Sequence, residues 1–238
     1  MAYVLDEHDK TSSTLLDIAR NHYNNYRPIN IFGFNRDVGI DFESIENDSG
    51  DYVYPSAASV LTVVSTSASD TMGVLISGLN SDYVEITETV TLTGVSAKTT
   101  TQAFFRVNNA IILAGSNVGD ITLKIGANLH GFIEAGLGTT QACVFTVPAG
   151  KTLYIYRIDL TSGTVNPNKY ITYRNVLQSS TGRILKVAEA TWQTGQQSFD
   201  RQIPYVITEK TDFEFEAKSS SGTNQVSIFV EGILGWGE

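Results

Sequence analysis

The sequence is poor in the residues that build covalent cross-links and metal centres. Its 238 residues contain one cysteine, Cys143, and three histidines, His8, His22 and His130. A single cysteine excludes an intrachain disulfide and a cysteine-based zinc site, and the histidines are too far apart for a His-x-x-x-His metal motif. We therefore expect no metal and no cofactor, and packing alone must hold the chain together.

Positive charge is also scarce. Lysine and arginine number 16 against 25 acidic residues, which gives a formal net charge of −9. Nucleic-acid binding relies on clustered basic side chains, and no such cluster is present. The first ten residues carry acids where a secretory signal would carry bases, and no apolar run approaches the length of a membrane span. We expect a protein made in a reducing cytoplasm, with no direct nucleic-acid partner and no membrane partner.

Signatures of catalysis are missing as well. The sequence has no Gly-x-Ser-x-Gly elbow, no P-loop and no dinucleotide-binding fingerprint. Each histidine is read as a surface or packing residue, because the three lie far apart in different contexts and have no companion cysteine for zinc. The prediction is a protein that is not an enzyme and has no catalytic residues.

Short β-strands are what the sequence does contain. Residues 83–92 alternate with a period of two, so that Val84, Ile86, Val90 and Leu92 share one face. Similar runs follow one another over residues 56–125 without a helical pattern between them. Parallel strands need a crossover of about a dozen residues or more, so this spacing indicates antiparallel pairing. A β-sandwich or jelly roll is predicted for residues 56–126.

One acid breaks the alternation of that strand. Glu88 falls on the same parity as Val84, Ile86 and Val90. Either a bulge between its neighbours re-aims the side chain, or the carboxylate pairs with a base. We favour a bulge or a partly exposed strand end.

A second β-series follows a stretch rich in glycine and small residues. Residues 127–141 have the composition of a linker, and 142–238 contain further alternating runs, including one that sets Phe213 and Phe215 opposite Glu214 and Glu216. The predicted fold is therefore all-β, with two tandem antiparallel β-sandwich or jelly-roll domains over 56–126 and 142–238.

Residues 1–55 are predicted to form an N-terminal arm with one short helix. Thr14 and Asp17 resemble a capping box, and Leu15, Ile18 and Tyr26 recur at helical spacing over about residues 13–25, before Pro28. A helix this short needs packing to stay ordered. Leu15, Ile18 and Tyr26 are therefore candidate interface residues that contact the first sandwich or a neighbouring subunit. The simpler alternative is a helix that covers a sheet edge.

Trp236 is a fourth candidate interface residue. It stands between two glycines at the end of the sequence, where an indole left in water would expose a large apolar area. We expect it to be buried, either in its own domain or in a pocket of a neighbouring subunit.

Tyrosines suggest one possible ligand site. Tyr154 and Tyr156 share a face and, with Tyr170 and Tyr173 on the next predicted strand, could form an aromatic platform that stacks sugars. We favour the other reading, in which these tyrosines lie in the core or at a subunit interface, where tyrosine is common.

Several motifs resemble a known family. SVLTVVSTSASDT, GLNSDYVEITETVTLTG, TTTQAFFRVN and GDITLKI are similar to the first domain of virion structural proteins of tailed bacteriophages, especially marine and cyanobacterial ones, and FTVPAGKTLYIYRI and TDFEFEAKSSSGTNQVSIFVEGIL are similar to their C-terminal domain. The resemblance covers most of residues 50–234. This sequence departs from the family at Met72, where small residues are usual. The resemblance implies a building block of the particle rather than an enzyme.

From this resemblance we expect a capsid-decoration, neck or fibre subunit located in the virion. It would assemble with copies of itself into a trimer or a ring. Its other partners would be capsid proteins, portal or neck proteins, or tail proteins. The competing hypothesis is a receptor-binding fibre tip that recognises a glycan, since sandwich domains also host that role and fold alone does not decide between them.

Overall fold

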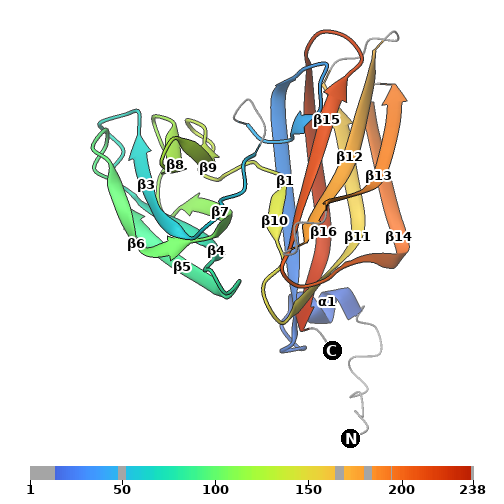
Figure 1. Cartoon of the computed structure of the whole chain (residues 1–238), viewed down its shortest axis with the longest axis horizontal. Coiled ribbons are helices and arrows are strands. Elements are labelled where there is room, and N and C mark those ends of the chain that lie inside the picture. Colours follow the sequence, from blue (N-terminus) through green and yellow to red (C-terminus); the bar gives the residue numbers. More distant parts are fainter. Residues whose placement is uncertain (1–13, 48–51, 164–168, 180–183, 194, 237–238) are drawn as a thin grey trace, which may run out of the picture.

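The computed structural model describes residues 14–47, 52–163, 169–179, 184–193 and 195–236, and within them it contains one short helix and two β-lobes side by side (Figure 1). All strand pairings between the named strands are antiparallel. The prediction of an all-β antiparallel fold with a short N-terminal helix is confirmed. No helix in the described ranges is long and apolar enough to cross a membrane.

The larger lobe is a jelly roll. Eight of its strands form two sheets, and if these eight are numbered in chain order the sheets read 1-8-3-6 and 2-7-4-5, which is the jelly-roll arrangement. In the first sheet the strands are β1 (Tyr26–Val38), β16 (Asn224–Trp236), β11 (Lys151–Ser162) and β14 (Gly195–Ile207). In the second they are β10 (Val144–Thr146), β15 (Thr211–Ser219), β12 (Tyr170–Ser179) and β13 (Ile184–Gln193), with β2 (Glu43–Ser44) also paired to β15.

Alternation in the sequence places the core between these two sheets. Phe213, Phe215 and Ala217 of β15 turn inward and meet Ile228 and Val230 of β16 in one buried apolar cluster. All five side chains are at most 5% exposed. The predicted period of two is thus the pattern that builds the core.

The smaller lobe is inserted between the first two of these eight strands, β1 and β10. It consists of β3 (Ser59–Ser65), β4 (Gly73–Leu79), β5 (Glu85–Thr91), β6 (Lys98–Phe104), β7 (Arg106–Ile112), β8 (Ile121–Ile125) and β9 (Asn128–Ile133). These strands form two sheets, β6-β3-β8-β9 and β5-β4-β7, around a separate core. We call the two parts the jelly-roll lobe and the inserted lobe.

This arrangement corrects the expected domain boundaries. The expected arm over residues 1–55 contains β1 and β2, which belong to the jelly-roll lobe, so the two domains are not in tandem. The expected linker over 127–141 contains β9, which pairs with β8. β1 pairs with β16, about two hundred residues away, from Tyr26 opposite Gly235 onward. No local pattern in the sequence can show such a partner.

The helix is also shorter than expected. α1 (Thr14–Ala19) ends before Asn21, which adopts a positive φ of 60°, a conformation that asparagine tolerates better than most residues. Pro28 lies inside β1 rather than at a helix end. Proline fits there because β1 is an edge strand, whose outer side needs no ladder donor.

Glu88 has a different structural role from the one expected. The pairing of β4 with β5 runs through it without a bulge, so the favoured bulge is wrong; the side chain is partly exposed, as expected, but lies in the middle of β5 and not at a strand end. Its carboxylate accepts hydrogen bonds from the backbone N–H groups of Thr101 and Gln102 on β6, at 2.7 Å and 2.9 Å. The side chain therefore links the two sheets of the inserted lobe by replacing missing ladder bonds.

Candidate functional site

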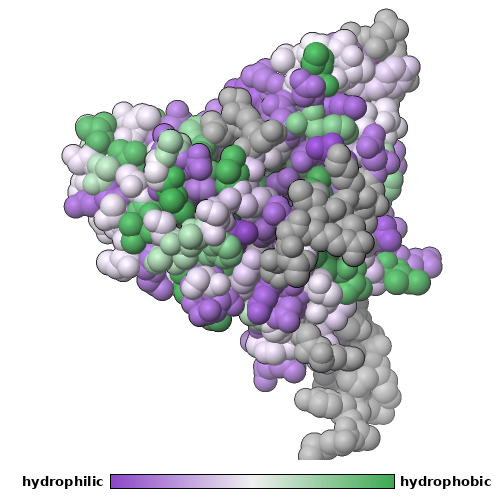
Figure 2. Space-filling model, viewed as in Figure 1, coloured by the Kyte–Doolittle hydropathy of each residue, from purple (hydrophilic) through white to green (hydrophobic). Residues whose placement is uncertain are grey.

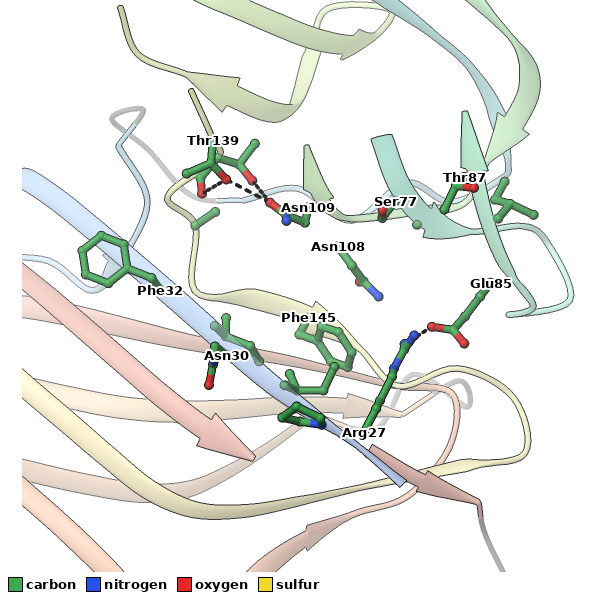
Figure 3. A pocket seen from close by; sticks show the side chains of 17 residues that line it. Arg27, Asn30, Phe32, Ser77, Glu85, Thr87, Asn108, Asn109, Thr139 and Phe145 are labelled. Carbon is green, nitrogen blue, oxygen red and sulfur yellow. Dashed lines mark hydrogen bonds and ion pairs between the residues drawn. The ribbon is translucent and has the colours of Figure 1, made fainter. Parts of the chain in front are cut away.

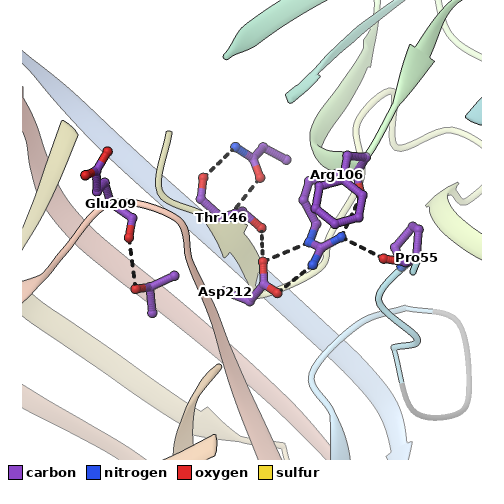
Figure 4. A network of polar contacts seen from close by, with 8 residues as sticks. Pro55, Arg106, Thr146, Glu209 and Asp212 are labelled. Carbon is purple, nitrogen blue, oxygen red and sulfur yellow. Dashed lines mark hydrogen bonds and ion pairs between the residues drawn. The ribbon is translucent and has the colours of Figure 1, made fainter. Parts of the chain in front are cut away.

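A buried ion pair joins the two lobes. Arg106 at the start of β7 meets Asp212 on β15 in a bidentate pair, with Nε to Oδ1 and Nη2 to Oδ2 both at 2.8 Å (Figure 4). The side chains are only 6% and 4% exposed. We call this pair the interlobe clamp. It fixes the inserted lobe to the jelly-roll lobe at one defined orientation.

The clamp is supported on both sides. The Thr146 hydroxyl donates to Asp212 at 2.7 Å, and Arg106 donates to the carbonyl of Pro55 at 2.9 Å. The rings of Tyr54 and Phe105 lie 5.0 Å and 3.9 Å from the guanidinium carbon. Removing two charges from water is costly, and these extra contacts help to offset that cost. Nothing in the local sequence around either charged residue indicated this pairing.

Beside the clamp lies a groove of about 530 Å³ between the lobes, which we call the interlobe groove (Figure 3). One wall is the outer side of the β5-β4-β7 sheet, and the other is the first half of β1. An ion pair between Arg27 of β1 and Glu85 of β5 spans it at one end. The volume falls within the usual range of ligand pockets, about 300–1,000 Å³.

The lining of the groove combines neutral polar side chains with apolar ones, since seven of its 17 residues are Asn, Ser or Thr and eight are apolar or glycine. Thr87, Ser77 and Asn109 stand opposite one another on three adjacent strands and so form a row across the sheet. The Asn109 side-chain oxygen accepts hydrogen bonds from the hydroxyls of Thr140 and Thr139, at 2.8 Å and 3.3 Å. These bonds hold the amide in place, with its nitrogen turned away from the threonines (Figure 3).

A second candidate region is an apolar surface at the end of the jelly-roll lobe where α1 lies (Figure 1). Its members come from α1, the turn that follows it, and the paired ends of β1 and β16, and each is 38–51% exposed: Leu15, Leu16, Tyr23, Tyr26 and Trp236. We call it the basal surface. Figure 2 shows hydrophobic atoms near this end and also across the inserted lobe.

The structure brings together some of the predicted interface residues. Tyr26 pairs with Gly235, and the Trp236 N–H donates to the Asn25 carbonyl at 3.2 Å. Leu15 is exposed on α1, whereas Ile18 is only 7% exposed and cannot serve a partner directly. Contacts between α1 and β1 explain that burial.

Trp236 is not buried in its own domain, so that alternative is wrong. Its side chain is 51% exposed, and the Lys151 ammonium lies over its ring. The ammonium partly covers the indole, because the face of an aromatic ring attracts a cation. Burial against a neighbouring subunit remains a prediction.

The four-tyrosine platform is wrong. β11 and β12 lie in different sheets, and Tyr173 is a core residue that is 1% exposed. Tyr154 and Tyr156 are both half-buried, and the register of β11 shifts around Tyr156 against both of its neighbouring strands. A sugar site on Tyr154 and Tyr156 alone remains a prediction.

The histidines lie in separate environments. His130 is buried, and its burial, together with the nearby Arg106 charge, lowers its pKa to about 4. His22 is exposed, with its Nδ1 3.5 Å from Asp17, and His8 lies outside the described residues. In the part of the chain that the structure describes, no group of three or more histidine, cysteine or acidic side chains could hold a metal ion.

The chain matches no family model and no curated protein. Among solved structures, it is similar to a chain in the structure of infectious bursal disease virus, Gx strain. The two chains share 13% identity, the match covers 88% of this chain and 71% of that chain, and the TM-score is 0.25. The VP2 subviral particle of the same virus gives 11% identity, 88% and 75% coverage, and a TM-score of 0.24. These scores are too low for the similarity to carry an argument about this chain.

Proposed function

We propose that the protein is a non-enzymatic structural subunit of a virion that assembles with copies of itself through the basal surface. The observation that carries the proposal is the grouping of Leu15, Tyr26 and Trp236 with other exposed apolar side chains at one end of the molecule. Single exposed apolar residues are ordinary, but a group that includes tryptophan and tyrosine is typical of an interface.

The architecture supports this role. Jelly rolls occur in viral capsid proteins and in lectins, so the fold permits a structural subunit without deciding the function. The interlobe clamp adds a mechanical argument, because Arg106 and Asp212 hold the two lobes as one block. A subunit of fixed shape can repeat one contact around a symmetric ring or trimer.

The resemblance of the sequence to structural proteins of tailed bacteriophages supports a finer proposal. The protein would be a capsid-decoration, neck or fibre subunit, made in the host cytoplasm and incorporated beside capsid, portal or tail proteins. Electron microscopy of the source particle with this protein tagged tests that placement, and a particle without the tag would contradict it.

The self-assembly is tested by measuring molar mass with light scattering across a range of concentrations. We expect wild type to form an oligomer, and Leu15→Ser and Trp236→Ser to shift it toward monomer without a large loss of melting temperature. Leu113→Ser is the matched control, because Leu113 on the inserted lobe is 53% exposed and Leu15 is 47% exposed.

Two results would contradict the basal surface as the interface. A wild type that is monomeric at every concentration would remove self-assembly. If Leu113→Ser dissociated the oligomer and both basal variants kept the molar mass of wild type, the contact between copies would lie on the inserted lobe.

A further inference from the structure

We propose that the interlobe groove is a binding site for a neutral oligosaccharide. This site is separate from the basal surface, and its argument does not depend on the assembly role. It also differs from the tyrosine site expected from the sequence, because neither Tyr154 nor Tyr156 lines the groove.

The chemistry of the lining selects the class of ligand. The groove presents hydroxyls and amides from Ser77, Thr87 and Asn109, with Asn30 on the opposite wall (Figure 3). Such groups can both donate and accept hydrogen bonds, and sugar hydroxyls do the same. The charged residues among the lining, Arg27 and Glu85, neutralise each other at one end. A ligand with many neutral hydroxyls therefore fits better than an ionic one.

The spacing of the polar row also suits a sugar chain. Thr87, Ser77 and Asn109 lie on neighbouring strands, and adjacent strands are about 4.8 Å apart. That interval is close to the length of one sugar ring. Successive rings laid across the sheet would each meet one polar side chain.

The opposite wall supplies an aromatic face. Phe32 on β1 lines the groove and is 39% exposed, although phenylalanine is normally buried where it can be. The C–H face of a sugar ring packs well on an aromatic ring, which offers a large apolar area. The groove thus combines a hydrogen-bonding wall with a stacking wall.

An extended peptide is the competing occupant, since it could pair with the outer edge of β1. Part of that edge is already used, because the Phe34 N–H donates to the Gln141 carbonyl at 3.2 Å. The segment from Gln141 onward leads directly into β10, so the edge is open only over the first half of β1. Few backbone groups on the β1 edge are therefore free to pair with a peptide, so an oligosaccharide is the favoured occupant.

The test uses the full chain on an array of neutral glycans, followed by calorimetry with the glycan that binds. Asn109→Asp keeps the oxygen that anchors Thr139 and Thr140 and removes the N–H donors, and Phe32→Ala removes the stacking face. We expect each to weaken binding by about tenfold or more, with an unchanged melting temperature for Asn109→Asp.

The matched control is Phe199→Ala. Phe199 is 38% exposed, close to the 39% of Phe32, and it lies on β14 at the other edge of the same sheet. Its replacement should leave binding unchanged, as should Tyr154→Ala. The proposal is overturned if no neutral glycan binds, if both groove variants bind like wild type, or if only Tyr154→Ala loses binding. A peptide panel gives the last outcome. If peptides but no glycans bound to wild type, and the groove variants weakened that binding, the groove would be a polypeptide site and the oligosaccharide proposal would be overturned.

Discussion

Among the described residues, three arginine–carboxylate pairs join the two lobes, and two of them, in the clamp and at the end of the groove, lie in opposite environments. In the interlobe clamp, the side chains of Arg106 and Asp212 are 6% and 4% exposed. At the end of the groove, those of Arg27 and Glu85 are 51% and 38% exposed. Each pair joins an arginine to a carboxylate, so the two differ in their surroundings and in the bidentate geometry of the clamp.

Burial changes what each pair can do. Water screens the exposed pair, and such pairs typically contribute about 0–1 kcal/mol. In the clamp, loss of one partner would leave the other charge buried without compensation, which makes the pair difficult to break. The clamp therefore sets how the lobes sit, whereas opening the exposed pair costs the fold about 1 kcal/mol or less.

The largest expected effect is that of Asp212→Ala. It leaves Arg106 buried beside Thr146 and two aromatic rings without its carboxylate, and we expect a loss of about 3–5 kcal/mol in the free energy of unfolding. Urea denaturation measures it. Asp200→Ala is the control, because the Asp200 side chain is 76% exposed. A loss under about 1 kcal/mol in Asp212→Ala would show that the clamp behaves like an exposed pair.

A second prediction concerns a buried carboxyl two residues from the clamp. Burial, and then the neighbouring Glu216 and Glu46, raise the pKa of Glu214 from 4.5 to about 8. The folded chain thus binds a proton that the unfolded chain releases, so stability from this group is full below about pH 4.5 and is lost as pH rises through about 8.

Glu214→Gln should remove that part of the pH dependence. We expect the variant to be more stable than wild type at about pH 9 and to show a flatter profile between about pH 5 and 9 in urea denaturation. Glu209→Gln on the loop before β15 is the control. Parallel profiles for wild type and Glu214→Gln would refute the assignment.

The smallest effect is expected for Arg27→Ala. Removing this exposed pair should change the free energy of unfolding by no more than about 1 kcal/mol, and by less at high salt. Arg36→Ala should have an equally small effect, since Arg36 also lies on β1 and forms an exposed pair with Glu134, just after β9. If Arg27→Ala approached the effect of Asp212→Ala, the contrast between the two pairs would fail.

Much of the inserted lobe could be predicted from local sequence. The alternation through Val84, Ile86 and Val90, together with short turns, indicated antiparallel strands because partners there are close in the chain. Glu88 shows the limit. Its parity marked it as unusual, but its hydrogen bonds go to Thr101 and Gln102 on a strand of the other sheet, and no local rule selects that partner.

The candidate sites show the same limit more strongly. Trp236 and Tyr26 were singled out one by one for their exposure or spacing, yet the pairing of β1 with β16 is what brings them together. The groove residues drew no attention in the sequence, because serine, threonine and asparagine on strands ordinarily face solvent. Only the position of the second lobe turns them into a lining.

The sequence by itself determined the all-β class, the antiparallel pairing of neighbouring strands and the short N-terminal helix, because these depend on periodicity and on turn residues within a few positions. The tertiary structure alone decided that the first long strand completes a jelly roll around an inserted lobe, that Arg106 finds Asp212 across 106 positions, and that a groove lies between the lobes. The physical reason is that burial and long-range pairing are properties of the assembled chain, and each side chain gains its role from neighbours that are distant in sequence.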